Sequence, residues 1–148
     1  MDTTSSPARL PRLLGVLMAI YLVASLLHFT HNAEYLADYP GLPPGWTCLG
    51  VYAAWFCITA TGLAGVWLLR RGWSSTGLAL IAVYALLGLD SLGHYLVAPL
   101  ASHTRVMNVS ILAEVGAALA VLVETVRQFA LSLLRRHRRR AAVLPAAQ

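Results

Sequence analysis

Residues 13–31 read "LLGVLMAIYLVASLLHFTH", an apolar run with no charged side chain before its two histidines. A helix rises about 1.5 Å per residue, so roughly 20 such residues cross a bilayer core about 30 Å thick. This run therefore predicts a transmembrane helix. A cleaved secretory signal is the alternative, but cleavage would place Arg70 and Arg71 on the outer side, against the arginine distribution described below.

Three more apolar runs of similar length follow the first one. The 148 residues are 58% hydrophobic and only 11% charged, which lies outside the range of a soluble domain. Short connections between the runs require neighbouring helices to be antiparallel. The sequence predicts an all-α fold, an integral membrane four-helix bundle with up-down-up-down topology. We expect one domain, residues 1–148, with spans at about 13–31, 47–69, 76–98 and 106–129.

The arginines predict how the bundle is oriented. All eleven basic residues are arginine, and only Arg105 lies on the side opposite the others. By the positive-inside rule, both termini are then cytoplasmic, and we expect a bacterial plasma membrane as the location. The run "RRHRRR" at 135–140 predicts a basic tail that attracts anionic lipid, and not a nucleic-acid arm. We expect residues 1–9 and the last few residues to be disordered.

Small residues four positions apart predict where helices pack closely in lipid. The second and fourth spans carry four such pairs: Ala60 with Ala64, Thr61 with Gly65, Ala113 with Ala117, and Gly116 with Ala120.

Ionisable residues gather towards the outer ends of three spans. The stretch "HFTHNAEY" at 28–35 ends the first span, Asp90 and His94 end the third, and Glu114 lies about two turns inside the fourth. A carboxylate inside a membrane helix is costly, so it usually faces the bundle interior and has a partner. We therefore expect one connected site made of His28, His31, Asp90, His94 and Glu114.

Two kinds of chemistry fit these five residues. They are candidate catalytic groups for proton transfer, because burial adjusts carboxyl and imidazole groups to exchange protons near neutral pH. The same five are candidate metal ligands, since histidine and carboxylates bind zinc, iron or copper. A hydrophobic lipid or isoprenoid is the expected substrate of an isomerase-like or cyclase-like enzyme. Its candidate binding residues are Asn32, Glu34, Tyr35 and Tyr95.

The residue pattern leaves other functions open. One alternative is a metal or haem carrier, with His28 and His94 as the axial pair. Another is a non-catalytic membrane subunit whose polar residues only hold helices together, and Asp90 with His94 could be a self-satisfied i,i+4 pair. Whether the chain is an enzyme, which cofactor it binds and whether it self-associates are left open by the sequence.

Two short motifs complete the sequence observations. "SLLHF" at 25–29 and "SLGHY" at 91–95 share Ser-Leu-x-His-aromatic, which would place His28 and His94 at matching depth. Four spans with "PPGW" at 43–46 before the second resemble the sterol-isomerase-like EXPERA membrane proteins. That resemblance implies His and Glu in a membrane pocket that protonate a sterol double bond. It covers the helix count and this loop, and it carries over no catalytic residue.

Overall fold

The computed structural model describes residues 10–143, and every regular element in that range is helical. The expectations of disorder fall on residues 1–9 and 144–148, which lie outside the described residues. The elements are α1 (Arg12–Glu34), η1 (Leu36–Asp38), α2 (Cys48–Arg70), α3 (Ser74–Leu89), η2 (Asp90–Gly93), α4 (His94–Val97), η3 (Leu100–Ser102) and α5 (Arg105–Val143). The label η marks 3-10 turns: η1 and η3 lie in connections, and η2 lies between α3 and α4.

The all-helical prediction is confirmed. Within the described residues, four helical segments are long and apolar enough to cross a membrane. These are Arg12–Glu34, Cys48–Arg70, Ser74–Val97 and Arg105–Arg135, close to the predicted bounds except that α5 continues well past residue 129.

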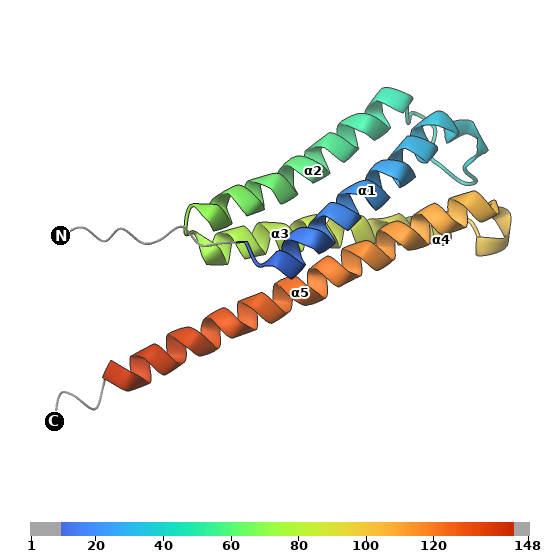
Figure 1. Ribbon diagram of the computed structural model, residues 1–148. Coiled ribbons are helices and arrows are strands. Elements are labelled where there is room, and N and C mark those ends of the chain that lie inside the picture. The colour runs from blue at the N-terminus through green and yellow to red at the C-terminus, as the bar shows by residue number, and fades with distance from the viewer. Residues whose placement is uncertain (1–9, 144–148) are drawn as a thin grey trace.

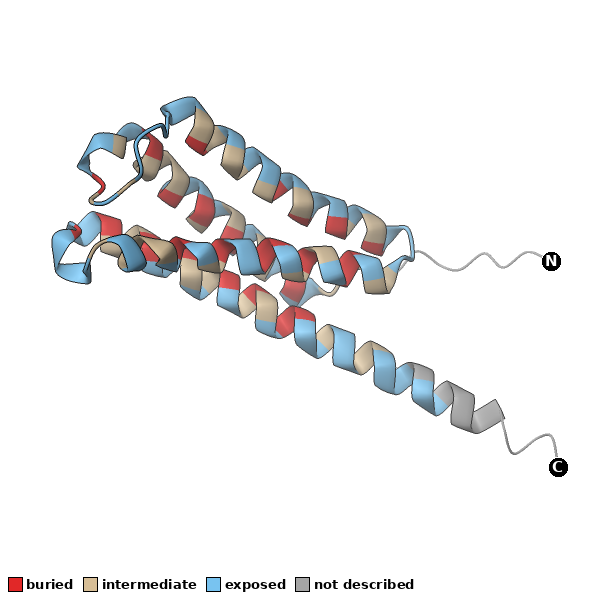
Figure 2. Cartoon of the chain, turned by 180° about the vertical axis from the view of Figure 1, so that it is seen from behind, coloured by how far each residue is buried: buried red, intermediate tan, exposed pale blue. Residues whose placement is uncertain are grey.

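The helices form an antiparallel bundle in which α1 packs against α2 and α5, and α3 packs against the same two helices (Figure 1). The connections after α1 and before α5 lie together at one end, which we call the loop end. The start of α1, the turn from α2 to α3 and the C-terminal part of α5 point towards the opposite end. Buried residues face inwards on the long helices α1, α2, α3 and α5, while the outer surface is largely exposed (Figure 2).

Local sequence determines several of the helix ends. The Thr47 hydroxyl accepts a 3.0 Å hydrogen bond from the backbone N–H of Gly50, which caps the start of α2. Gly72 has a φ of 88° in the turn from α2 to α3, and Gly41 has a φ of 74° in the connection after α1. Other residues rarely adopt such values, so glycine suits these two turns.

Helix packing uses some of the small residues that the spacing predicted, Gly65 among them, but not others. Backbones approach most closely where Gly65 on α2 meets Gly77 on α3, since a Cβ added to Gly77 would lie 2.7 Å from the Gly65 carbonyl oxygen. In contrast, Ala60, Ala64 and Gly116 are exposed, so these predicted contacts were wrong within the bundle. Spacing of four identifies a helix face but does not say whether that face meets a neighbour.

The third span also departs from a regular helix. Its α-helix ends at Leu89 and continues through the 3-10 turn η2 into α4. A 3-10 helix has about 3.0 residues per turn instead of 3.6, so residues four apart are rotated by roughly 120° instead of about 40°. Asp90 is exposed, whereas His94 is half-buried, and within the described residues no hydrogen bond or ion pair joins the two side chains.

Candidate functional site

Glu114 is the central residue of the polar cluster near the loop end. It lies on α5 with an exposed fraction of 0%. Its Oε2 accepts a 2.6 Å hydrogen bond from the Ser91 hydroxyl in η2, while its Oε1 has no hydrogen-bond partner among the described residues. A buried carboxyl with one free oxygen is costly unless it is protonated or shares a proton with a neighbour.

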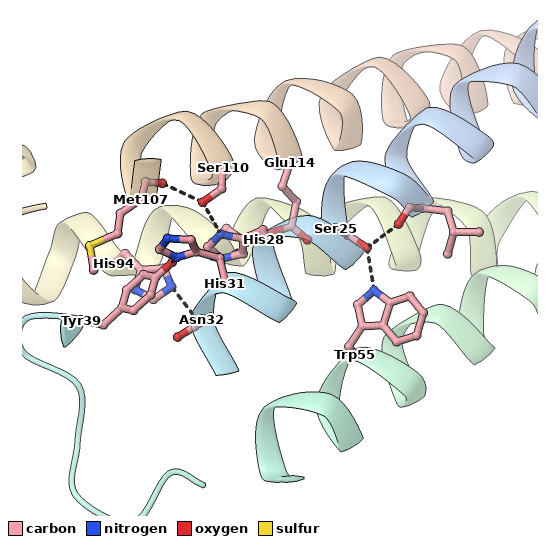
Figure 3. A network of polar contacts seen from close by, with 12 residues as sticks. Ser25, His28, His31, Asn32, Tyr39, Trp55, His94, Met107, Ser110 and Glu114 are labelled. Carbon is pink, nitrogen blue, oxygen red and sulfur yellow. Dashed lines mark hydrogen bonds and ion pairs between the residues drawn. The ribbon is translucent and has the colours of Figure 1, made fainter. Parts of the chain in front are cut away.

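His28 is the ionisable side chain that faces this carboxyl. Its ring is only 2% exposed, and its Nε2 lies 3.7 Å from Oε2 of Glu114. Its Nδ1 lies 3.2 Å from the hydroxyl of Ser110, which donates its own proton to the Met107 carbonyl at 2.9 Å (Figure 3). Ser110 therefore accepts from His28, which places a proton on Nδ1 and leaves Nε2 to face Glu114.

At 3.7 Å, the His28 and Glu114 side chains are within ion-pair range, but the distance is longer than a hydrogen bond. A small approach of the two groups would allow one proton to lie on the carboxyl, leaving both groups neutral, or on Nε2, leaving an imidazolium beside a carboxylate. Because the net charge is unchanged, the proton can move without burying an uncompensated charge.

Further imidazoles extend from this pair towards the loop end. The ring of His28 meets that of His94 edge to face at a centroid distance of 5.4 Å, and His94 meets His103 at 6.2 Å. Nδ1 of His103 donates to the Pro99 carbonyl at 3.2 Å, which leaves its buried Nε2 without a partner in the described part of the chain. Four groups, from Glu114 to His103, thus form a continuous row.

Tyr39 folds back from the connection after α1 into this row. It is 4% exposed, and its ring lies 5.1 Å from His94 and 5.7 Å from His31, measured between centroids. Its hydroxyl lies 2.9 Å from Nδ1 of His31. Burial raises the pKa of Tyr39 to about 12, so the side chain remains a neutral phenol near neutral pH.

A cavity of about 270 Å³ lies beside the pair. Its polar wall contains His28, Asn32, Ser91 and His94, and the side-chain nitrogen of Asn32 lies 3.4 Å from Nε2 of His94. Much of the remaining wall is apolar, from α2, the connection after α1 and the end of the third span. Both residues that contact Glu114 therefore also line a space large enough for part of a ligand.

The other predicted site residues lie at the margin or outside the cavity. Asp90 is exposed but lines the cavity edge, and His31 reaches the row through Tyr39. Glu34 is exposed and accepts from the Tyr52 hydroxyl at 3.0 Å, while Tyr35 is exposed beside His31.

Tyr95 points towards α5 instead. Its hydroxyl donates to Asn108 at 2.9 Å. Of the predicted residues, the structure thus brings His28, His94, Glu114 and Asn32 together most closely.

Three residues of this cluster were not predicted as site residues: Ser91, Ser110 and Tyr39. The repeated Ser-Leu-x-His motif contained a signal for Ser91, because it places Ser91 in the same position relative to His94 as Ser25 has relative to His28. No comparable pattern marks Tyr39, whose position depends on how the connection folds.

The metal-ligand hypothesis receives no support from the positions of these residues. In residues 10–143, no group of three or more His, Cys, Asp or Glu side chains is arranged to hold a metal ion. The two histidines suggested as axial haem ligands direct their Nε2 atoms at different partners, Glu114 and Asn32. Both assignments stay predictions.

No protein-family model matches this chain, and comparisons with curated proteins and with solved structures find no match either. The resemblance to the EXPERA proteins therefore depends on the helix count and the "PPGW" loop alone.

Proposed function

We propose that this protein is a membrane-embedded enzyme that catalyses proton transfer on a hydrophobic lipid or isoprenoid substrate. The observation that carries the proposal is the completely buried Glu114. Its carboxyl lies 3.7 Å from Nε2 of His28, a residue that lines a mainly apolar cavity. Buried acid and imidazole groups that can exchange a proton are typical of general acid–base catalysis.

The membrane part of the proposal is supported by the outer surface of the bundle. Large apolar side chains are exposed on the long helices, among them Leu27, Leu49, Phe56 and Val109. A soluble protein rarely exposes apolar surface over so wide an area. The arginine distribution favours an orientation in which the loop end, and with it the site, lies on the extracytoplasmic side.

The reaction class that fits the pair is movement of a double bond or a related cyclisation. The pair donates a proton to one carbon of a C=C bond, and a neighbouring carbon then returns a proton to the pair. One C–H bond forms and one breaks, so no electrons are gained or lost and no co-reactant is needed. His94 and His103 extend the row of imidazoles towards the loop end.

Solvent deuterium tests this proposal. The purified protein is reconstituted with unsaturated isoprenoid and acyl lipids in D₂O, and the lipids are analysed by mass spectrometry. We expect one lipid class to gain deuterium at carbon in a protein-dependent manner. Glu114→Gln should slow this incorporation by about 100-fold or more, the usual contribution of a general acid or base.

Glu124 provides a matched control on the same helix. It is also a buried glutamate, but it is bound to Arg127 and Gln128 far from the cavity. Glu124→Gln should keep incorporation near the wild-type rate, when rates are compared per folded protein. Equal rates for wild type and Glu114→Gln, or no incorporation above a protein-free sample, would refute the proposed function.

A further inference from the structure

Asn32 and His94 line the cavity, and each has one buried atom whose hydrogen-bonding capacity the described residues do not use. The amide of Asn32 contacts Nε2 of His94 at 3.4 Å through one of its two ends. The other end of the amide and the Nδ1 of His94 are both buried, and neither has a partner among residues 10–143. Figure 3 shows the amide reaching His94 with one end only.

The chemistry of the two free atoms does not depend on which way the amide is turned. If the amide NH₂ donates to Nε2, the free groups are the amide oxygen, an acceptor, and Nδ1–H, a donor. If the amide is reversed, Nε2–H donates to its oxygen, and the free groups are the NH₂, a donor, and the bare Nδ1, an acceptor. Either arrangement leaves one donor and one acceptor.

Once small rotations of the two side chains open these atoms to the cavity, a ligand group that satisfies both must accept one hydrogen bond and donate another. A hydroxyl does this with a single oxygen atom. Charge around the cavity argues against an anionic headgroup, because no arginine is among the described residues that line it and the chain contains no lysine. The carboxylate of Asp90 at the cavity edge would repel a phosphate further.

The rest of the wall indicates what the hydroxyl is attached to. Leu36, Leu42 and Ile58 are among the apolar side chains that line the cavity, which therefore suits a hydrocarbon chain. Its volume of about 270 Å³ is slightly below the roughly 300–1,000 Å³ of sites that enclose a drug-sized ligand. A headgroup and the first part of a chain fit, and the exposed side chains of Leu87 and Val97 at the wall lie where a longer chain would continue towards lipid.

We propose that the cavity binds the hydroxyl end of an uncharged lipid alcohol, held between Asn32 and His94. This inference rests on the proposed function only in naming the substrate class of the same site, since binding does not require proton transfer. Asn32 and His94 orient the alcohol, whereas His28 and Glu114 carry out the chemistry.

Equilibrium binding of three lipids with the same chain tests the inference: farnesol, farnesyl methyl ether and farnesyl phosphate. Each competes with tritiated farnesol for the wild-type protein in nanodiscs. The ether accepts but cannot donate, so it leaves one buried polar group unpaired and should bind about 5- to 100-fold more weakly than the alcohol. The phosphate should bind at least as weakly, because its charge has no cationic partner in the wall.

Variants then assign the selectivity to a residue. Asn32→Leu has a similar size without the polar end and should reduce the alcohol-to-ether affinity ratio to about one. Asn108→Leu makes the same change at the chain's other asparagine, which bonds to loop carbonyls and does not line the cavity, and it should preserve the ratio.

The possible results separate this inference from the proposed function. If farnesol binds the wild-type protein no more tightly than the ether or the phosphate, or does not bind, the inference is wrong whether or not the variants fold. Selective alcohol binding that persists in Glu114→Gln supports it even if deuterium incorporation never occurs, in which case only the proposed function fails.

Discussion

The hydroxyl of Ser91 donates a 2.6 Å hydrogen bond to Oε2 of Glu114, joining the 3-10 turn of the third span to the first third of α5. It is the only hydrogen bond to this carboxyl within the described residues. Ser91→Ala would leave both carboxyl oxygens without a donor, at a cost of about 1–3 kcal/mol. We expect a lower thermal unfolding midpoint in detergent and slower deuterium incorporation.

Ser102 offers a control for this change. It lies in the short turn η3 near the same end of the bundle, and its side chain is exposed. Ser102→Ala should leave both the unfolding midpoint and incorporation close to wild type. A Ser91→Ala protein as stable as Ser102→Ala would show that the hydrogen bond contributes little.

The contact that Tyr21 of α1 makes with α3 inside the bundle depends on Gly88. The Tyr21 hydroxyl and ring occupy the space where a Cβ at position 88 would lie, and Tyr21 is held there by its 3.2 Å hydrogen bond to the Tyr84 carbonyl. Gly88→Ala should therefore destabilise the protein by about 1–3 kcal/mol, the usual cost of overpacking. Unfolding titrations in mixed micelles measure this change. Gly116→Ala is the control, because no described atom lies within 4 Å of its added Cβ.

Alkaline pH should weaken the contribution of Tyr39. Burial raises its pKa from 10.0 to about 12, so folding favours the neutral phenol. The associated stability is fully present below the unfolded pKa of about 10 and is lost as the pH rises to about 12. At neutral pH, Tyr39→Phe loses the hydrogen bond to His31 and should be less stable by about 0.5–1.5 kcal/mol.

The pH dependence of that difference is the measurement. Wild type should lose its advantage over Tyr39→Phe between pH 10 and 12, as followed by thermal unfolding, because phenylalanine cannot ionise. Tyr35→Phe removes an exposed hydroxyl nearby and controls for general effects of alkali. A constant difference across this range would contradict the assignment.

The two native cysteines can test the orientation in the membrane. Both are exposed and unpaired on α2, with Cys48 at its loop end and Cys57 nine residues further, about 13 Å along the helix. With the loop end outside, a membrane-impermeant maleimide added to intact cells should label Cys48 and not Cys57. Cys48→Ala should abolish labelling, and Cys57→Ser should preserve it. Labelling that requires permeabilised cells would reverse the orientation.

Helix number and approximate bounds could be predicted because each depends on a local property, the length of an apolar run. The rotation of each helix could not, since it depends on contacts with partners that a single sequence does not reveal. Ala60 and Ala64 have the spacing of a packing face and yet are exposed, whereas Gly62 is buried against Tyr84. The 3-10 turn between Asp90 and His94 could not be predicted either, because the apolar run there predicts a regular α-helix.

Residues of the candidate site could be predicted from the sequence where exposing an ionisable side chain to lipid would cost free energy. Glu114 lies inside an apolar helix and needs a partner, so its inward position follows from the cost of exposing it to lipid. His28 and His94 lie in matching motifs at the ends of parallel spans, and their rings are in fact adjacent. Tyr39 was not predictable in this way, because its burial depends on a connection rich in proline and glycine whose path no periodic pattern describes.

The two buried glutamates of α5 should respond oppositely to the same substitution. Glu124 accepts from Arg127 at 2.7 and 3.0 Å and from Gln128 at 2.6 Å, so Glu124→Gln loses an ion pair and should lower the unfolding midpoint. Glu114 has only Ser91 as a donor. A glutamine there can still accept from Ser91 and buries no ionisable carboxyl, so Glu114→Gln should be as stable as wild type or more stable. Residues kept for chemistry often show this gain when replaced, because function and not stability selects them. If Glu114→Gln instead melts several degrees lower, as expected for Glu124→Gln, the cluster acts as a structural connection between helices, and the non-catalytic alternative replaces the enzyme.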